Sequence, residues 1–506
     1  MLFNSYSFLF IFLPVVLTVF HVLGRATYRV VWLVSASFFF YAWWNPSYLG
    51  LILFSIAFNY TIGVLLERSQ KKNVLIFGVI INLCVLGYFK YTNFFVDNIN
   101  SFFNVDINFE YIILPLAISF FTFQQIAYLV DVYLGKVKES NFLDFCLFVT
   151  FFPQLIAGPI VHHKEMLPQF SRNFSQKIKV QHFAIGLSIF IIGLVKKVVI
   201  ADGISVYATP IFDAAEQGMV LTLFESWGGA LAYSFQLYFD FSGYSDMAIG
   251  IARMFGVKLP LNFNSPYKAT SIIDFWRRWH ITLSRFLRDY VYIPLGGNRQ
   301  GYRRRYLNIF ITMLLGGIWH GAGWTFALWG GLHGLLLVAN QFYRKTFKRK
   351  MLNNFFSWLI TFVLITILWV LFRAQSIDGA MAMYYGMFGF NGISLPQSLL
   401  LHVREFQFYF QGFNIVFNGM FFNGVFDANG VVWIVSILLV TTFLPNTQQI
   451  MSYRGPINEI DKEDSLLKLK WLKWQPNLPW AMLLSIFFVM AILGMSNISE
   501  FLYFQF

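Results

Sequence analysis

Apolar runs long enough to cross a membrane recur from one end of this chain to the other, and they constrain its fold more than any other feature. A helix needs about 20 residues to cross a hydrocarbon core about 30 Å thick. Runs close to that length occur at 7–24, 29–44, 47–66, 73–89, 111–133, 181–201, 224–250, 354–372, 431–446 and 479–495. Hydrophobic residues make up 57% of the sequence and charged residues 12%, which is more apolar side chain than one water-soluble core can bury. We therefore predict an all-α polytopic membrane protein, with about 10–12 transmembrane helices in a single domain over residues 1–506.

The positions of Lys and Arg predict the orientation of these helices, because short cytoplasmic loops are enriched in both residues. Basic residues at 25–29, 68–72 and 136–138 would face the cytoplasm, and the acidic segment 96–110 would face outward. The N-terminus is then extracytoplasmic, and the basic cluster at 468–473 places the C-terminus on the same side. No basic residue precedes the first run and no small-residue cleavage site follows it, so we expect a retained span and not a signal peptide.

Two apolar segments, 142–160 and 306–340, do not fit a chain that crosses the membrane once at every apolar run. A span at 142–160 would export the basic stretch 164–179, and the second segment is too long for one span and has basic clusters on both sides. We therefore expect each segment to enter the membrane and return on the same side, which is tolerated where the broken backbone is buried in protein. Prolines and glycines supply the breaks: Pro153, Gly158 and Pro159 in the first segment, and Gly316, Gly317, Gly321 and Gly323 in the second.

Two histidines, His280 and His320, lie in the most apolar half of the sequence. A titratable ring inside a membrane costs free energy unless it is paired or functional, so both are candidates for a functional site. The alternative is that each is only a hydrogen-bonding partner between helices. His320 would lie at the deepest point of segment 306–340, and its neighbouring glycines favour a functional role. His333 is a third candidate, but its apolar neighbours favour a structural role.

No metal site is expected, because the residues around these histidines do not form a ligand pattern typical of a metal centre. The two cysteines, Cys84 and Cys146, lie in apolar runs and indicate neither a disulfide framework nor a metal site. The tryptophans near the histidines are expected to pack inside the protein or at the membrane interface: Trp319, Trp324 and Trp329.

Three strings resemble the membrane-bound O-acyltransferase family: DFWRRWHITLS at 274–284, YIPLGGN at 292–298 and IWHGAGW at 318–324. Further matches are spread over nearly the whole chain, including SFFTF at 119–123, PQLIAGP at 153–159, FDFSGYSD at 239–246 and FLYFQF at 501–506. The likeness is to the bacterial branch typified by the alginate O-acetyltransferase membrane protein, which O-acetylates cell-envelope polysaccharides. It implies a multi-pass protein of the bacterial cytoplasmic (inner) membrane, with helices and re-entrant helices around a central catalytic funnel.

The resemblance also implies roles for the two histidines. His320 stands where the family has its catalytic histidine, and His280 stands where the family has a companion His or Asn. Moving an acyl group from a thioester to a hydroxyl requires removal of the hydroxyl proton, and histidine titrates near neutral pH. We therefore expect His320 to act as a general base. The charge that develops on the carbonyl oxygen would be stabilised by His280 or by backbone N–H groups of residues 321–323.

The donor that the resemblance implies is acetyl-CoA, which is a substrate and not a bound cofactor. In the D-alanylating relatives the donor is a thioester on a carrier protein. Either donor is anionic and would reach the cytoplasmic side, where basic residues could bind its phosphates. No glycine-rich phosphate loop is present. The residues expected to bind the donor are Trp276, Arg277, Arg278 and Arg285.

The C-terminal string FLYFQF resembles an aromatic motif of the polysaccharide-modifying branch, in which a tyrosine is thought to carry the acyl group outward. That tyrosine is Tyr503 here. The alternative is an aromatic anchor at the membrane interface. The implied partners are a polysaccharide acceptor such as alginate, peptidoglycan or another exopolysaccharide, an extracytoplasmic SGNH-type acetyltransferase, and membrane lipids. No nucleic-acid partner is expected.

Two other functions remain open at this point. A D-alanyl or protein acyltransferase would have the same fold, although the chain length and the C-terminal motif favour the acetylating branch. A membrane transporter would also contain broken helices and buried polar groups. No inverted repeat is visible in the sequence, and the paired histidines fit acyl transfer better than transport.

Overall fold

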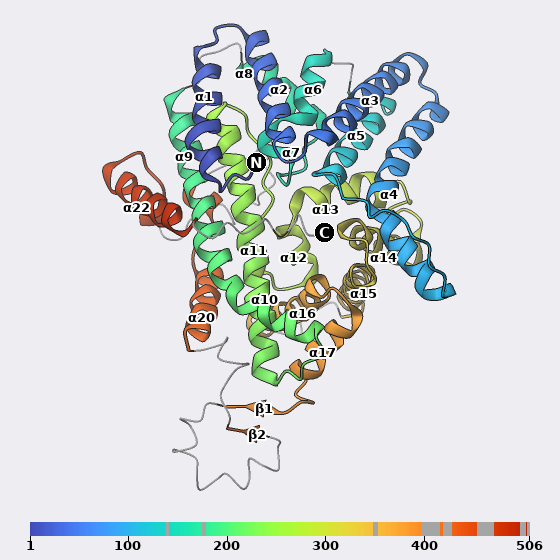
Figure 1. Cartoon of the computed structure of the whole chain (residues 1–506), viewed down its shortest axis with the longest axis vertical. Coiled ribbons are helices and arrows are strands. Elements are labelled where there is room, and N and C mark those ends of the chain that lie inside the picture. The colour runs from blue at the N-terminus through green and yellow to red at the C-terminus, as the bar shows by residue number, and fades with distance from the viewer. Residues whose placement is uncertain are drawn as a thin grey trace. The chain divides into compact units, whose positions relative to one another are not determined.

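The regular structure of the chain is almost entirely helical, as Figure 1 shows for the computed structural model. The structure describes residues 1–137, 141–174, 179–347, 353–395, 415–417, 428–452, 470–495 and 502. Within these residues the strands are limited to β1 (Ile393–Ser394) and β2 (Ile415–Val416), which form a short parallel pair. The all-α prediction is therefore confirmed.

The chain divides into two compact units built from interleaved segments. The first comprises Met1–Val195, Ser242–Asn262 and Thr447–Gln505, and the second comprises Lys196–Phe241, Phe263–Asn446 and Phe506. The long helix α11 (Leu223–Met254) contributes to both. The single domain expected over residues 1–506 stays a prediction.

The first unit contains fourteen of the described helical elements other than α11. They are η1 (Phe8–Phe12), α1 (Leu13–Val22), α2 (Ala26–Ala42), η2 (Pro46–Tyr48), α3 (Leu49–Ser69), α4 (Lys72–Phe103), α5 (Ile118–Tyr133), α6 (Phe142–Thr150), α7 (Phe152–Leu155), α8 (His163–Asn173), α9 (Val180–Val195), α21 (Thr447–Met451), η8 (Lys470–Leu472) and α22 (Leu478–Gly494). Buried amides join its apolar helices: Asn82 Nδ2 on α4 donates to Asn59 Oδ1 on α3 at 2.7 Å. Such bonds satisfy polar groups that would otherwise be buried at a cost.

The second unit holds the remaining described elements and both candidate histidines. Its helical elements are η3 (Lys196–Ala201), α10 (Asp202–Glu216), η4 (Pro266–Lys268), α12 (Ile272–Arg278), α13 (Ile281–Leu287), η5 (Arg288–Tyr292), α14 (Gly301–His320), α15 (Trp324–Thr346), α16 (Asn354–Arg373), α17 (Ile377–Met387) and α20 (Ala428–Phe443).

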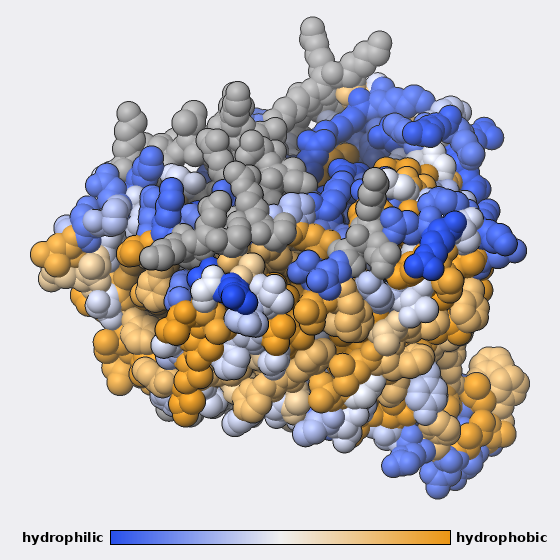
Figure 2. Space-filling model, turned by 90° about the horizontal axis from the view of Figure 1, so that it is seen from above, coloured by the Kyte–Doolittle hydropathy of each residue, from blue (hydrophilic) through white to orange (hydrophobic). Residues whose placement is uncertain are grey.

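Four helical segments among the described residues are long and apolar enough to cross a membrane: Pro46–Ser69, Lys72–Phe103, Val180–Glu216 and Asn354–Arg373. Shorter apolar helices cover Phe8–Val22, Asn429–Phe443 and Leu478–Gly494. Apolar residues also cover much of the surface seen in Figure 2, and many large apolar side chains on the helices are exposed. In water, protein molecules with such an apolar surface would associate with one another, whereas in a membrane lipid covers the surface. The number of spans stays a prediction.

The run predicted at 111–133 is helical only from Ile118, so its predicted start is wrong. Ala117 has a left-handed backbone with φ of 62°, which a right-handed helix cannot continue through. Upstream, the Asn93 side chain bonds to both backbone groups of Ile112, donating to its carbonyl at 2.9 Å and accepting from its N–H at 3.1 Å. These bonds replace those of a helix, and periodicity alone does not reveal them.

The segment 142–160 breaks as its prolines and glycine predict. Helix α6 ends at Thr150, Phe151 is not helical, and Pro153 lies in the first turn of the short helix α7. The side chains from 145 to 162 are buried in the described structure. The break is therefore confirmed, whereas the path of this segment through the membrane stays a prediction.

The segment 306–340 also turns where its glycines predict. Helices α14 and α15 lie side by side (Figure 1) and are joined through residues 321–323. A Cβ atom on Gly330 would lie only 2.9 Å from the Cα atom of Gly317, so the two backbones meet without side chains between them. This close packing fixes the hairpin and leaves His320 as the last residue of α14.

Candidate active site

His320 ends α14 inside a cluster of aromatic rings in the second unit. Only 4% of the residue is exposed. Its ring centroid lies 5.3 Å from that of Trp329 on α15, 5.2 Å from that of Phe372 on α16 and 5.0 Å from that of Trp319. Edge-on contacts of this kind restrict the ring to a narrow range of orientations. The imidazole is therefore held in place from three sides.

His280 occupies the corner between α12 and α13 in a strained backbone conformation. Its φ of 42° and ψ of 54° are left-handed, which costs an L-residue roughly 1–2 kcal/mol. The ring is buried, with its centroid 4.8 Å from that of Phe241 in an edge-on contact. Strain of this kind persists where the surrounding structure enforces it, and it gathers at functional sites. The corner turns the His280 side chain into the protein.

The structure brings the two predicted catalytic histidines together. The ring centroids of His280 and His320 are 6.4 Å apart, and their planes are inclined by 59°. They come from segments about forty positions apart in sequence, one at a helix corner and one at a helix end. Two imidazoles at this spacing can act on one polar group bound beside both, which is the arrangement that proton transfer and oxyanion stabilisation require.

His333 belongs to the packing around this pair. It is completely buried on α15, its Nδ1 atom accepts a hydrogen bond of 3.2 Å from Trp276 Nε1, and its ring lies 4.6 Å from Trp329. Trp329 in turn contacts His320. Trp369 on α16 stacks on Trp329 at 5.7 Å. The predicted structural role of His333 agrees with this position, which supports the rings that surround His320.

The four residues predicted to bind the donor lie in different settings. Trp276 is buried and donates to His333. Arg278 forms an ion pair in which its Nε atom is 2.9 Å from Asp274 Oδ1. Arg277 is exposed on α12, and Arg285 is partly buried on α13. Trp276 and Arg278 thus interact with other residues of the protein. Of the two arginines on α12, Arg277 is the more exposed.

A buried charge cluster in the same unit was not predicted from the sequence. Lys197 Nζ lies 2.6 Å from Asp240 Oδ1 and 2.9 Å from Asp202 Oδ1. Lys197 and Asp240 are buried, and Lys197 lies in the π-helical segment η3. The Lys197–Asp240 pair joins η3 to α11 immediately before Phe241, whose ring packs on His280, and the Lys197–Asp202 pair joins η3 to the first residue of α10. The Lys197–Asp240 pair therefore links η3 to the part of α11 that contacts the histidine corner.

One signal could have revealed this cluster. Lys197 interrupts the apolar run 181–201, and Asp240 interrupts the run 224–250. The first run also contains Lys196, and the second also contains Glu225 and Asp246. Charges of opposite sign in two membrane-length runs are expected to pair inside the protein, but the sequence does not show which residues pair. The predicted relay residue Tyr503 lies outside the described residues, which include only Leu502 from the C-terminal aromatic string.

Residues 135–377, which include His280, His320 and His333, match the membrane-bound O-acyltransferase family. The chain is 48% identical over 430 residues to a peptidoglycan O-acetyltransferase from Helicobacter pylori, with 78% of this chain and 81% of that protein covered. It is 45% identical over 407 residues to a probable alginate O-acetylase from Pseudomonas aeruginosa, with 78% and 76% covered. A teichoic acid D-alanyltransferase from Bacillus subtilis is 29% identical over 255 residues, with 48% and 62% covered. The predicted enzyme class is confirmed, and the transporter alternative falls: the chain is a membrane O-acyltransferase and belongs to the membrane-bound O-acyltransferase family.

Proposed function

We propose that this enzyme uses acetyl-CoA to O-acetylate a polysaccharide of the cell envelope outside the cytoplasm. The pairing of the His280 and His320 rings at 6.4 Å carries the chemical part of the proposal. The acceptor class is supported by relatives named for peptidoglycan and alginate, each matched over more than three quarters of this chain. The D-alanylating relative matches less than half of it at lower identity, which favours acetyl as the transferred group.

In the proposed reaction, His320 removes the proton of an acceptor hydroxyl while the hydroxyl oxygen attacks the thioester carbonyl carbon. The new C–O bond forms and the carbonyl electrons move onto oxygen, where an N–H of His280 stabilises the negative charge. The carbonyl then re-forms as the C–S bond breaks, and the proton held by His320 passes to the departing thiolate. The products are an acetyl ester and the free thiol of coenzyme A.

The donor arrives from the cytoplasm in this proposal, and Arg277 is the predicted donor-binding residue best placed to meet an anionic group in solution. The acceptor hydroxyl of the reaction above is the Tyr503 phenol, which leaves the step as an acetyl ester. A nucleophile of an SGNH-type partner outside the membrane then takes the acetyl group, and the phenolate regains a proton as the ester C–O bond breaks. That partner then acetylates the polymer. The scheme requires an inner-membrane location, which the family resemblance implies, and an extracytoplasmic C-terminus, which the distribution of basic residues predicts.

The donor is tested with membranes that contain the full-length enzyme. Membranes supplied with acetyl-CoA labelled in the acetyl group should transfer label to the enzyme or to added polymer, whereas membranes supplied with a labelled D-alanyl carrier protein should not. Membranes containing the His320→Ala variant provide the background. Transfer from the D-alanyl carrier alone would replace acetyl-CoA with that donor while leaving the enzyme class unchanged.

His280→Ala is expected to lower the rate of acetyl transfer by about 10²- to 10³-fold, the usual cost of removing one oxyanion donor. His280→Asn should retain part of the activity, because an amide still donates a hydrogen bond. At this left-handed corner asparagine is tolerated better than alanine, so the two variants are compared per folded molecule. Initial rates with labelled acetyl-CoA, normalised to folded protein, make the comparison. Equal activity in both variants and the unchanged enzyme would reduce His280 to a packing residue.

A further inference from the structure

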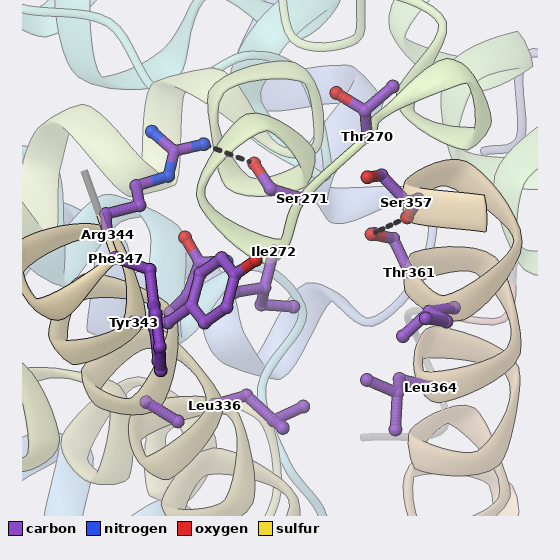
Figure 3. A pocket seen from close by; sticks show the side chains of 13 residues that line it. Thr270, Ser271, Ile272, Leu336, Tyr343, Arg344, Phe347, Ser357, Thr361 and Leu364 are labelled. Carbon is purple, nitrogen blue, oxygen red and sulfur yellow. Dashed lines mark hydrogen bonds between the residues drawn. The ribbon is translucent and has the colours of Figure 1, made fainter. Parts of the chain in front are cut away.

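The second unit contains a cavity that the proposed reaction does not use. It has a volume of about 760 Å³ and lies between α15 and α16, beside the residues that precede α12. Figure 3 shows Arg344 and Leu336 from α15 on one side and Leu364 from α16 on the other. A volume of this size falls in the range of about 300–1,000 Å³ typical of small-ligand sites.

The cavity is polar at one end and apolar at the other. Arg344 and Leu336 are separated by about 12 Å along α15, at about 1.5 Å per residue. The side of the cavity formed by α16 also changes from polar to apolar, from Ser357 near the start of the helix to Leu364. Leu364 is about ten residues into α16, or about 15 Å along its axis. That depth equals about half of a 30 Å hydrocarbon core, which is one leaflet.

The polar end is built to receive an anion. An Arg344 guanidinium nitrogen donates to Ser271 Oγ at 3.1 Å, which holds the guanidinium at the cavity. None of the described residues that line the cavity is acidic. Asp274, one turn into α12, is engaged by Arg278 at 2.9 Å. Arginine presents several N–H donors in one plane, a geometry that suits phosphate oxygens.

The surroundings of the cavity are those of a lipid-facing helix pair. Helix α16 is one of the four segments apolar enough to span a membrane. Large apolar side chains next in sequence to cavity-lining residues are exposed on both helices: Leu335, Phe342, Phe356 and Leu359. A lipid could therefore enter sideways between the helices. The leucines at the deep end suit an acyl chain, whereas the amides of a coenzyme A arm would find no partner in Leu336 or Leu364.

We propose that this cavity binds one anionic phospholipid of the cytoplasmic leaflet, with its phosphate at Arg344 and Ser271 and an acyl chain between α15 and α16. The cytoplasmic leaflet is the one that carries anionic lipids in excess and the one that the basic end of α15 is predicted to face. The bound lipid would fill the space between α15, which follows the catalytic hairpin turn, and α16, which supplies Phe372 to the His320 cluster.

The test is native mass spectrometry of the purified full-length enzyme titrated with phosphatidylglycerol. Arg344→Gln should weaken binding of the tightest phosphatidylglycerol about tenfold, the loss expected for one charge-assisted hydrogen bond. Lys345→Gln is the matched control, since it removes the same charge one residue along the helix. Lys345 Nζ lies over the Tyr302 ring at 3.9 Å and does not line the cavity. The control should change binding by less than about threefold.

A second variant tests the cavity without changing charge. Ala339 is exposed on α15 and lines the cavity, so Ala339→Trp should fill the space and reduce phosphatidylglycerol binding while Arg344 remains. Size-exclusion profiles confirm that each variant is folded. Three results would overturn the proposal: equal losses in Arg344→Gln and Lys345→Gln, equally tight binding of phosphatidylethanolamine, or displacement of phosphatidylglycerol by acetyl-CoA. The last result would assign the cavity to the acyl donor.

Discussion

Acetyl transfer is expected to disappear when His320 is replaced by alanine, while the protein remains folded in the membrane. The variant lacks the proton acceptor, and loss of a general base typically lowers a rate by about 10²- to 10⁴-fold. The ring also contacts Trp329 and Phe372, so its removal leaves a small void beside two aromatic rings. That void should lower stability by about 1–3 kcal/mol, which is too little to explain complete inactivity in folded protein.

His333→Ala separates these two effects. It removes an equally buried imidazole from the same aromatic cluster, together with the hydrogen bond from Trp276. We expect this control to unfold at a lower temperature than the unchanged enzyme but to keep measurable activity per folded molecule. Thermal unfolding in detergent and initial rates with labelled acetyl-CoA give the two quantities. Near-normal activity of His320→Ala would contradict the general-base role. Equal inactivity of the folded His333→Ala variant would assign the loss to disturbed packing.

The hairpin that carries His320 could be predicted because two independent signals agree on it. Basic clusters on both sides of 306–340 require the segment to return, and the glycines define where it can turn. The structure places the turn at residues 321–323 and adds the close contact of Gly317 with Gly330. The sequence shows that glycines are present but not which pair meets, because that depends on how the two helices rotate about their axes.

The separation of His280 and His320 could not be predicted in the same way. Resemblance to a family indicates that the two residues act together, but their 6.4 Å spacing depends on the left-handed corner at His280 and on the rings that confine His320. A histidine with positive φ has no distinctive sequence pattern. Tertiary packing enforces this conformation, and packing between distant segments is what a single sequence reveals least.

Charge alone also did not predict which of the basic residues on α12 is available to a donor. Arg277 and Arg278 are adjacent in sequence and were expected to act alike as cations at the cytoplasmic surface. One turn of helix separates Arg278 from Asp274, which lets those two side chains pair, while Arg277 points elsewhere and is exposed. The i to i+4 spacing was visible in the sequence. Charge counting alone does not distinguish a cation that stabilises its own helix from one that meets a ligand.

Replacing Tyr503 with phenylalanine is expected to stop delivery of acetyl groups to polymer, although it removes only one oxygen atom. The relay that we propose needs the phenolic oxygen to form an ester. An aromatic anchor at the membrane interface needs only an amphipathic or apolar ring, which phenylalanine largely preserves. Acetate released from purified polymer by mild alkali measures delivery, in cells that contain either form of the enzyme at equal amounts.

Phe504→Leu is the matched variant for this test, because it removes a neighbouring ring and leaves the Tyr503 hydroxyl in place. The relay predicts that Tyr503→Phe is inactive in delivery and that Phe504→Leu is active, whereas an anchoring role predicts the reverse order. When the extracytoplasmic acceptor is absent, mass spectrometry should detect an acetyl group on the tail peptide of the unchanged enzyme and none on the tail peptide of His320→Ala. Normal polymer acetylation by Tyr503→Phe would exclude the relay. The acetyl group would then have to pass directly from the site of His280 and His320 to the acceptor, without a covalent stop on the tail.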